Sequence, residues 1–189
     1  VVCKNDYQFR YTKSCVLIEF NPSNPEQGIT NHLRSKYNNN IKSQINVNAS
    51  TLRDGDPYDV LAYDGNSWHF RTFNNDQDWI CFDFGGKQII PKCCTIKSAN
   101  ENPNAEHPKS WVIEVSIDQS EWVTLETQNK NSSLNGKSIV HTFSLQNLKG
   151  KNNKYQFIRM RQTSNNWNNG NDLMIGSFEI YGKLILNSS

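Results

Sequence analysis

One alternating segment, residues 109–122, limits the possible folds more than any other part of the chain. Its first half places Trp111, Ile113, Val115 and Ile117 on one face and smaller or polar residues on the other. A period of two with β-branched and aromatic side chains is typical of a strand that buries one face. Polar turn residues follow, and then the apolar pattern resumes. The segment therefore predicts a β-hairpin whose aromatic side chains anchor the core of a sheet.

Similar strand patterns recur along the whole chain. They cover residues 7–11, 15–20, 45–50, 78–84, 89–96, 139–145, 155–163 and 173–186. Only residues 28–37 have helical spacing, with Ile29, Leu33 and Tyr37 on one face. Many short strands with one short helix and no βαβ alternation predict an all-β fold, an antiparallel β-sandwich or jelly roll. We expect one sandwich domain over 28–186, an N-terminal extension over 1–27 that packs on it, and a tail over 187–189.

Side chains within these strands carry further expectations. Trp79, Trp111 and Trp122 lie in strands or at their ends, so we expect all three in the core. Arg159 and Arg161 share one strand face, which predicts a solvated face or an ion pair. Pro91 cannot donate a hydrogen bond to a sheet ladder, so it is expected at a strand start or on an edge.

Composition excludes several classes of function. The 20 Lys and Arg residues nearly balance the 18 Asp and Glu residues, so charge does not favour nucleic acid or membrane insertion as a partner. No catalytic triad, phosphate-binding loop or metal triad appears, and the chain is predicted not to be an enzyme. Five cysteines without a C-x-x-C pair indicate free thiols and a reducing compartment. The chain begins at Val1, and we expect it to be a piece of a longer protein.

Five motifs, taken in their order along the chain, carry a family resemblance. They are D-P-Y-D-V-L-A-Y-D-G-N-S-W (56–68), D-W-I-C-F-D-F-G (78–85), K-S-W-V-I-E-V-S-I-D-Q-S-E-W (109–122), Y-Q-F-I-R-M-R-Q-T-S-N-N-W (155–167) and I-G-S-F-E-I-Y-G (175–182). Together they resemble the F5/8 type C (discoidin) family, whose fold is the galactose-binding-like jelly roll. The sequence is most similar to an intracellular, Asn-rich branch of that family in protists.

The resemblance implies a non-catalytic binding module that works through loops at one end of the sandwich. The matching loops are 48–57, 68–77 and 165–172, and their polar composition indicates that they do not insert into a membrane. The candidate ligand-binding residues in these loops are Trp68, Arg71, Asn165, Asn166, Trp167, Asn168 and Asn171. The main hypothesis is binding of protein partners within a larger intracellular scaffold or cytoskeletal assembly, in the cytoplasm.

The alternative hypothesis is a lectin-like, carbohydrate-binding module. Trp68 or Trp167 would stack on a sugar ring, while Arg71 and the asparagines would bind hydroxyls. No cofactor is expected in the main hypothesis. Calcium remains open in the alternative, because Glu179 matches a calcium-ligand position of some sugar-binding relatives and Asp64 lies in the loop that supplies another.

Overall fold

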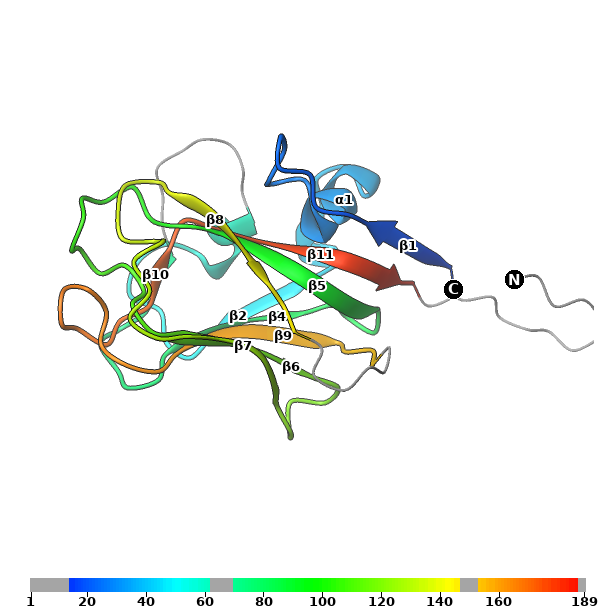
Figure 1. Ribbon diagram of the computed structural model, residues 1–189. Coiled ribbons are helices and arrows are strands. Elements are labelled where there is room, and N and C mark those ends of the chain that lie inside the picture. The colour runs from blue at the N-terminus through cyan, green and yellow to red at the C-terminus, as the bar shows by residue number, and fades with distance from the viewer. Residues whose placement is uncertain (1–13, 62–69, 147–152, 187–189) are drawn as a thin grey trace, which may run out of the picture.

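The structure is a computed structural model that describes residues 14–61, 70–146 and 153–186 (Figure 1). Two antiparallel sheets pack face to face, which confirms the predicted β-sandwich. One sheet has the strand order β1-β11-β5-β8 and the other has the order β2-β4-β9-β6-β7. A short pair, β10 and β3, forms a third, two-stranded sheet. No helix in the described part of the chain is long and apolar enough to cross a membrane.

The element bounds follow the predicted segments closely. The strands are β1 (Cys15–Ile18), β2 (Asn46–Ala49), β3 (Phe70–Arg71), β4 (Trp79–Asp83), β5 (Gln88–Lys97), β6 (Trp111–Ser116), β7 (Val123–Gln128), β8 (Val140–Ser144), β9 (Phe157–Gln162), β10 (Met174–Ile175) and β11 (Ser177–Ile185). The helices are α1 (Ile29–Lys36) and two 3₁₀ helices, η1 (Ile41–Ser43) and η2 (Pro57–Leu61). The predicted helix is confirmed as α1, while the segment 7–11 lies outside the described residues.

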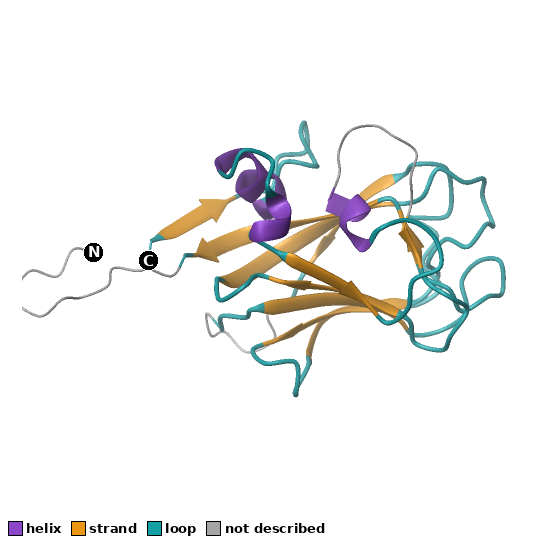
Figure 2. Ribbon diagram, turned by 180° about the vertical axis from the view of Figure 1, so that it is seen from behind, coloured by secondary structure: helices purple, strands orange, loops and turns teal. Residues whose placement is uncertain are grey.

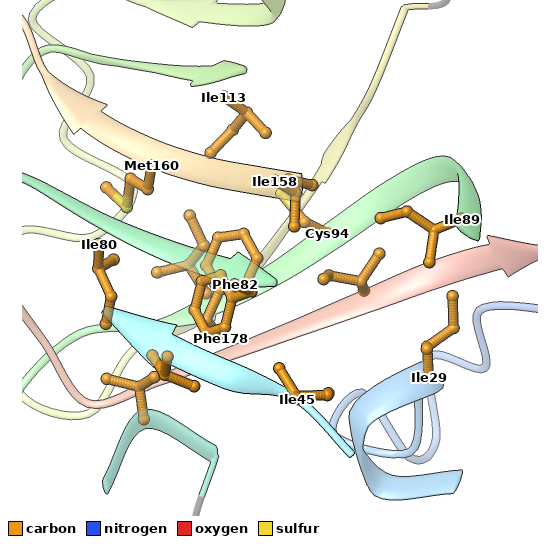
Figure 3. Close-up of a cluster of buried hydrophobic side chains, with 14 of the residues drawn as sticks. Ile29, Ile45, Ile80, Phe82, Ile89, Cys94, Ile113, Ile158, Met160 and Phe178 are labelled. Atoms are coloured by element: carbon orange, nitrogen blue, oxygen red, sulfur yellow. The ribbon is translucent and has the colours of Figure 1, made fainter. Parts of the chain in front are cut away.

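The hydrophobic core fills the space between the two sheets (Figure 3). Phe82 of β4 stacks on Phe178 of β11, with ring centroids 4.8 Å apart. Ile80, Ile158 and Met160 surround this pair, and all are fully buried. Because the alternating apolar residues of both sheets meet here, burial of apolar surface is the main force that holds the sandwich together.

The predicted hairpin is confirmed as β6 and β7, but its burial differs from the prediction. All six residues of β6 are buried, so the strand is covered on both faces and not on one. On the outer face, the Glu114 carboxylate accepts bonds from Arg159 Nε (2.8 Å) and from Arg161 Nε and Nη2 (3.0 and 2.7 Å). These long arginine side chains cover the strand. The ion-pair interpretation of Arg159 and Arg161 is therefore confirmed.

The tryptophans divide between the core and this outer face. Trp111 is fully buried in the core, as expected. Trp79 and Trp122 are only half-buried, so their assignment to the core was wrong. The ring of Trp122 covers the Arg159 guanidinium, whose carbon lies 3.8 Å from the ring centroid. Ile117, expected inside with Trp111, begins the turn after β6 and is 63% exposed.

Pro91 corrects another expectation, because it lies inside a central strand. β5 pairs with β11 on one side and with β8 on the other. Pro91 lies opposite Gly182 where the register shifts between Tyr181 and Gly182. Gly182 has φ +142°, and a Cβ there would clash with the Ile90 carbonyl oxygen. This bulge lets the strand accept a residue without an N–H group.

The two ends of the sandwich differ in character (Figures 1 and 2). Long loops gather at one end, at the left of Figure 1, and the two termini of the described chain lie at the other. We call the first the loop end and define it by the loops 50–56, 72–78, 98–110 and 163–173. The opposite end carries the tight turns 84–87 and 117–122. Residues of the N-terminal extension contact the sandwich here, because β1 pairs with β11 and Tyr181 Oη donates to the Pro25 carbonyl oxygen.

Candidate ligand-binding site at the loop end

A polar hollow of about 380 Å³ lies at the loop end. The β3–β4 loop, the last residue of β9 and the β9–β10 loop form its walls. Its lining residues are Asp76, Gln77, Gln162, Thr163, Ser164, Asn165 and Asn171. Every one of these side chains carries a hydrogen-bonding group, so the hollow is suited to a ligand rich in hydroxyl or amine groups.

Gln162 is the buried polar residue of this hollow. As the last residue of β9 it is only 1% exposed. Its Nε2 donates to the Asn171 carbonyl oxygen (2.8 Å), but its buried Oε1 has no hydrogen-bond partner among the described residues. A buried acceptor without a donor costs free energy that a ligand donor would recover. Gln162 does not stand out in the sequence, because it continues the regular pattern of β9.

Two predicted residues, Asn165 and Asn171, lie at the hollow. Asn165 Nδ2 donates to the Asn169 carbonyl oxygen (2.9 Å), and Asn171 Nδ2 donates to Asp76 Oδ1 (2.8 Å). These bonds orient both amides and leave their Oδ1 atoms without a protein donor in the described structure. The hollow therefore presents oriented acceptors that belong to the predicted loop.

Asn166 has a different role, because it shapes the loop from inside. The residue is fully buried. Its Nδ2 donates to the carbonyl oxygen and Oδ1 of Asp172 (3.1 and 3.0 Å), and its Oδ1 accepts from the N–H groups of Asn168 and Gly170 (3.0 and 2.9 Å). With both ends of the amide engaged, Asn166 holds the loop and offers nothing to a ligand.

Arg71 and Asn168 join a charged network beside the hollow. Arg71 Nε donates to Asp172 Oδ2 (2.6 Å), and its Nη2 donates to Glu106 Oε1 (3.0 Å). Asn168 Nδ2 donates to the same Glu106 oxygen (3.2 Å). Arg71, Glu106 and Asn168 do not line the hollow. Since Arg71 already binds two carboxylates, its positive charge ties the loops together.

Trp167, one of the two predicted tryptophans, does not line the hollow. Trp167 is half-buried, its backbone N–H donates to the His107 carbonyl oxygen (3.1 Å), and Lys109 Nζ lies 5.2 Å from its ring centroid. It is absent from the lining of the hollow. Trp68 lies outside the described residues. Stacking of a sugar on Trp167 in this hollow is therefore not supported, while stacking on Trp68 stays a prediction.

Two exposed apolar side chains at the loop end correct the expectation of purely polar loops. Leu52 is 47% exposed and Phe73 is 53% exposed. They lie on adjacent loops, because the Phe73 N–H donates to Thr51 Oγ1 (3.0 Å). Single apolar residues inside polar stretches were the available signal for both.

Glu179, the candidate calcium ligand, is instead the cap of helix α1. Its carboxylate accepts from the N–H and hydroxyl of Thr30 (2.9 and 2.8 Å) and from the N–H of Asn31 (3.0 Å). Gly28 permits this approach, since a Cβ there would lie 2.5 Å from Glu179 Cγ. Burial raises the pKa of Glu179, while these hydrogen bonds act in the opposite direction. An acidic group at a helix N-terminus satisfies free N–H groups, so this role accounts for the buried Glu179 carboxylate without calcium.

The described residues offer no alternative metal site, and two of their free cysteines are buried. They contain no group of three or more His, Cys, Asp or Glu side chains placed to hold a metal ion. Asp64, the second candidate calcium ligand, lies outside them. The thiols of Cys81 and Cys94 are buried, and burial raises the pKa of Cys81 to about 12 and that of Cys94 further. Thiols of this kind act as small apolar side chains and not as nucleophiles.

Comparisons with known proteins agree with this geometry. The sequence model of the F5/8 type C domain family matches residues 41–176. The E3 ubiquitin-protein ligase Ufd4 of Drosophila melanogaster is 29% identical over 136 residues, which make up 71% of this chain and 5% of the ligase. The chain thus spans only a small part of that relative.

Solved structures show the same fold. A Clostridium perfringens carbohydrate-binding module in complex with GalNAc-β-1,3-galactose is 12% identical, with a TM-score of 0.56 over 74% of this chain and 96% of the module. The family 32 module of C. perfringens NanJ in complex with galactose is 14% identical, with a TM-score of 0.53 over 74% of this chain and 95% of the module. At these identities the likeness shows the fold. Because the family model matches most of the sequence, the chain belongs to the F5/8 type C domain family.

Proposed function

We propose that this domain is a non-catalytic carbohydrate-binding module that holds a saccharide in the polar hollow at its loop end. The observation that carries the proposal is Gln162, a residue of the lining of the hollow whose buried Oε1 has no donor in the described structure. Sugar hydroxyls are donors of the required kind, and each also accepts hydrogen bonds. Asn165, Asn171 and Asp76 add oriented groups around the same space.

The comparisons support this proposal over the protein-scaffold hypothesis. Several structures with this fold are carbohydrate-binding modules solved with a bound sugar, among them GalNAc-β-1,3-galactose and galactose. Because the sequence identities to those modules are low, the proposed site is assigned from the residues of this chain and not from theirs. Binding is proposed to be independent of calcium, since Glu179 is occupied by helix α1.

A glycan array in the presence and absence of EDTA tests the proposal. We expect saturable binding that EDTA does not change, and its loss in Gln162→Leu and Asn165→Ala. Glu121→Gln is the matched control, because Glu121 is an exposed residue in the 117–122 turn of the opposite end. If the folded protein binds no glycan on the array, the carbohydrate-binding proposal is refuted. If Gln162→Leu and Asn165→Ala both still bind glycan, the hollow is refuted as the binding site.

A second candidate function is binding of a protein partner. The exposed Leu52 and Phe73 favour it, because exposed apolar side chains beside polar groups are typical of interaction surfaces. The match to a small part of a ubiquitin ligase is in keeping with a module of a larger protein. In this proposal the domain belongs to the intracellular, Asn-rich protist branch and serves in a cytoplasmic scaffold or a cytoskeletal assembly.

The two candidates differ in the residues that they need. A pull-down from cytosolic and cytoskeletal extract should lose its captured partner in Phe73→Ser if protein binding is the function. The same variant should keep glycan binding, because Phe73 does not line the hollow. Capture that Phe73→Ser leaves unchanged would remove the reason to prefer this surface.

A further inference from the structure

We infer that the hollow selects saccharides by charge, taking amine-bearing and neutral sugars and discriminating against sugars that carry carboxylate or sulfate groups. The inference rests on the proposed function, because it concerns the ligand of the same hollow. Three observations support it: the negative charge of the surrounding loops, the free hydrogen-bond acceptors in the hollow, and the neighbouring arginines that are already paired with carboxylates.

The loops that shape the hollow carry only negative charge. Segments 72–78 and 163–172 together contain three aspartates and no lysine or arginine. Asp76 lines the hollow directly and is exposed. Of the other two, Asp78 is buried and accepts from Thr51 Oγ1 (3.3 Å), and Asp172 is paired with Arg71. Asp76 is thus the carboxylate available to a ligand.

The neighbouring cations are already engaged. Arg161 donates through Nε and Nη2 to Glu114 (3.0 and 2.7 Å), and through Nη1 to Gln77 Oε1 (2.9 Å). Arg71 is held between Asp172 and Glu106. Among the described residues, no lysine or arginine lines the hollow. An anionic sugar would therefore approach Asp76 without a cation to balance it.

The amide groups that the protein leaves free in the hollow are mostly acceptors, while the hydroxyls of Thr163 and Ser164 can both donate and accept. The Oδ1 atoms of Asn165 and Asn171 and the Oε1 of Gln162 have no protein donor among the described residues. Gln77 adds an amide nitrogen, since its Oε1 is occupied by Arg161. An ammonium group brings three donors, and a hydroxyl brings one, whereas carboxylate and sulfate groups bring none. These acceptors therefore favour amine-bearing and neutral sugars, as the negative charge of Asp76 also does.

Matched oligosaccharides test this selectivity with the full chain. The probes are an oligomer of glucosamine, the same oligomer fully N-acetylated, and an oligomer of galacturonic acid, each titrated by calorimetry at low and moderate salt. We expect the glucosamine oligomer to bind most tightly and the galacturonic acid oligomer most weakly. An exposed ion pair changes affinity by about twofold to fivefold, and salt should reduce this difference.

The variant Asp76→Asn isolates the charge. It should weaken binding of the glucosamine oligomer by about twofold to fivefold and leave that of the N-acetylated oligomer unchanged. Glu121→Gln removes a carboxylate from the opposite end and should change neither.

The outcomes separate the inference from the proposed function. If the galacturonic acid oligomer binds as tightly as the neutral one, the selectivity is refuted and the carbohydrate-binding function stands. If no oligosaccharide binds to the folded wild-type protein, and the glycan array is also empty, both are refuted. If Asp76→Asn weakens all sugars equally and lowers the melting temperature, Asp76 is structural and the inference fails.

Discussion

Two polar regions of this domain use their hydrogen-bonding groups in opposite ways. On the outer face of the five-stranded sheet, Glu114 takes three hydrogen bonds from Arg159 and Arg161, and Trp122 covers Arg159. In the hollow at the loop end, the buried acceptor of Gln162 has no donor among the described residues. The first region is satisfied within the protein and contributes stability. The second is completed only by something bound to it, so binding is expected there.

The largest expected effect comes from breaking the satisfied region. Glu114→Ala leaves two half-buried arginines without their shared carboxylate, and removal of one partner of such a network costs about 3 kcal/mol in the free energy of unfolding. Urea denaturation of both proteins measures this loss. A loss below about 1 kcal/mol would show that the network is as weak as an exposed ion pair.

A smaller loss is expected where Glu179 caps helix α1. Glu179→Ala removes the carboxylate that accepts from the N–H groups of Thr30 and Asn31, which should cost about 2 kcal/mol. Glu179→Gln keeps one acceptor oxygen and should cost less. Equal losses in the two variants, by thermal or urea unfolding, would contradict the capping role.

Acidification should weaken the satisfied region in a defined direction. Burial acts to raise the pKa of Glu114, but hydrogen bonds from Arg161 and Arg159 outweigh it and hold the pKa below its ordinary value. The unfolded chain therefore takes up this proton at higher pH than the folded protein does. The contribution of Glu114 is complete above the ordinary glutamate pKa and is lost as pH falls through the folded value.

The urea midpoint from pH 7 to pH 3 measures this dependence. Glu114→Gln should show a shallower decline than the wild type, because the titrating group is gone. Parallel curves for the two proteins would mean that other carboxylates dominate acid unfolding.

The smallest effect on stability is expected in the hollow. Gln162→Leu removes the free acceptor together with one hydrogen bond to the Asn171 carbonyl oxygen, so the free energy of unfolding should fall by no more than about 1 kcal/mol. Saccharide binding should nevertheless be lost. A loss as large as that of Glu114→Ala would place Gln162 with the structural residues and remove the contrast between the regions.

Much of the fold could be predicted from the sequence, because periodicity reports local burial. The alternation in 109–122 gave the β6–β7 hairpin, and the spacing of Ile29 and Leu33 gave helix α1. Burial on the outer face could not be predicted this way, since it depends on Arg159 and Arg161 reaching Glu114 from 45 and 47 positions away.

The site was predictable only in part for the same reason. The family resemblance pointed to the loop of Asn165 and Asn171, and both line the hollow. The partners of Arg71 lie 35 and 101 positions away, and those of Glu179 lie 148 and 149 positions away. Contacts of that separation follow from strand order and leave no local pattern in the sequence. Gln162 was missed because a free buried acceptor is visible only in the structure.

The most direct test of the account is a saccharide titration followed by the backbone amide signals of the labelled domain. A sugar that binds on the glycan array should shift the signals of Asp76, Gln77 and residues 162–171 in a saturable way. The signals of the 117–122 turn should stay unchanged. Shifts concentrated instead at the opposite end, around Ile117, Val123 and Tyr155, would contradict the assignment of the hollow as the binding site.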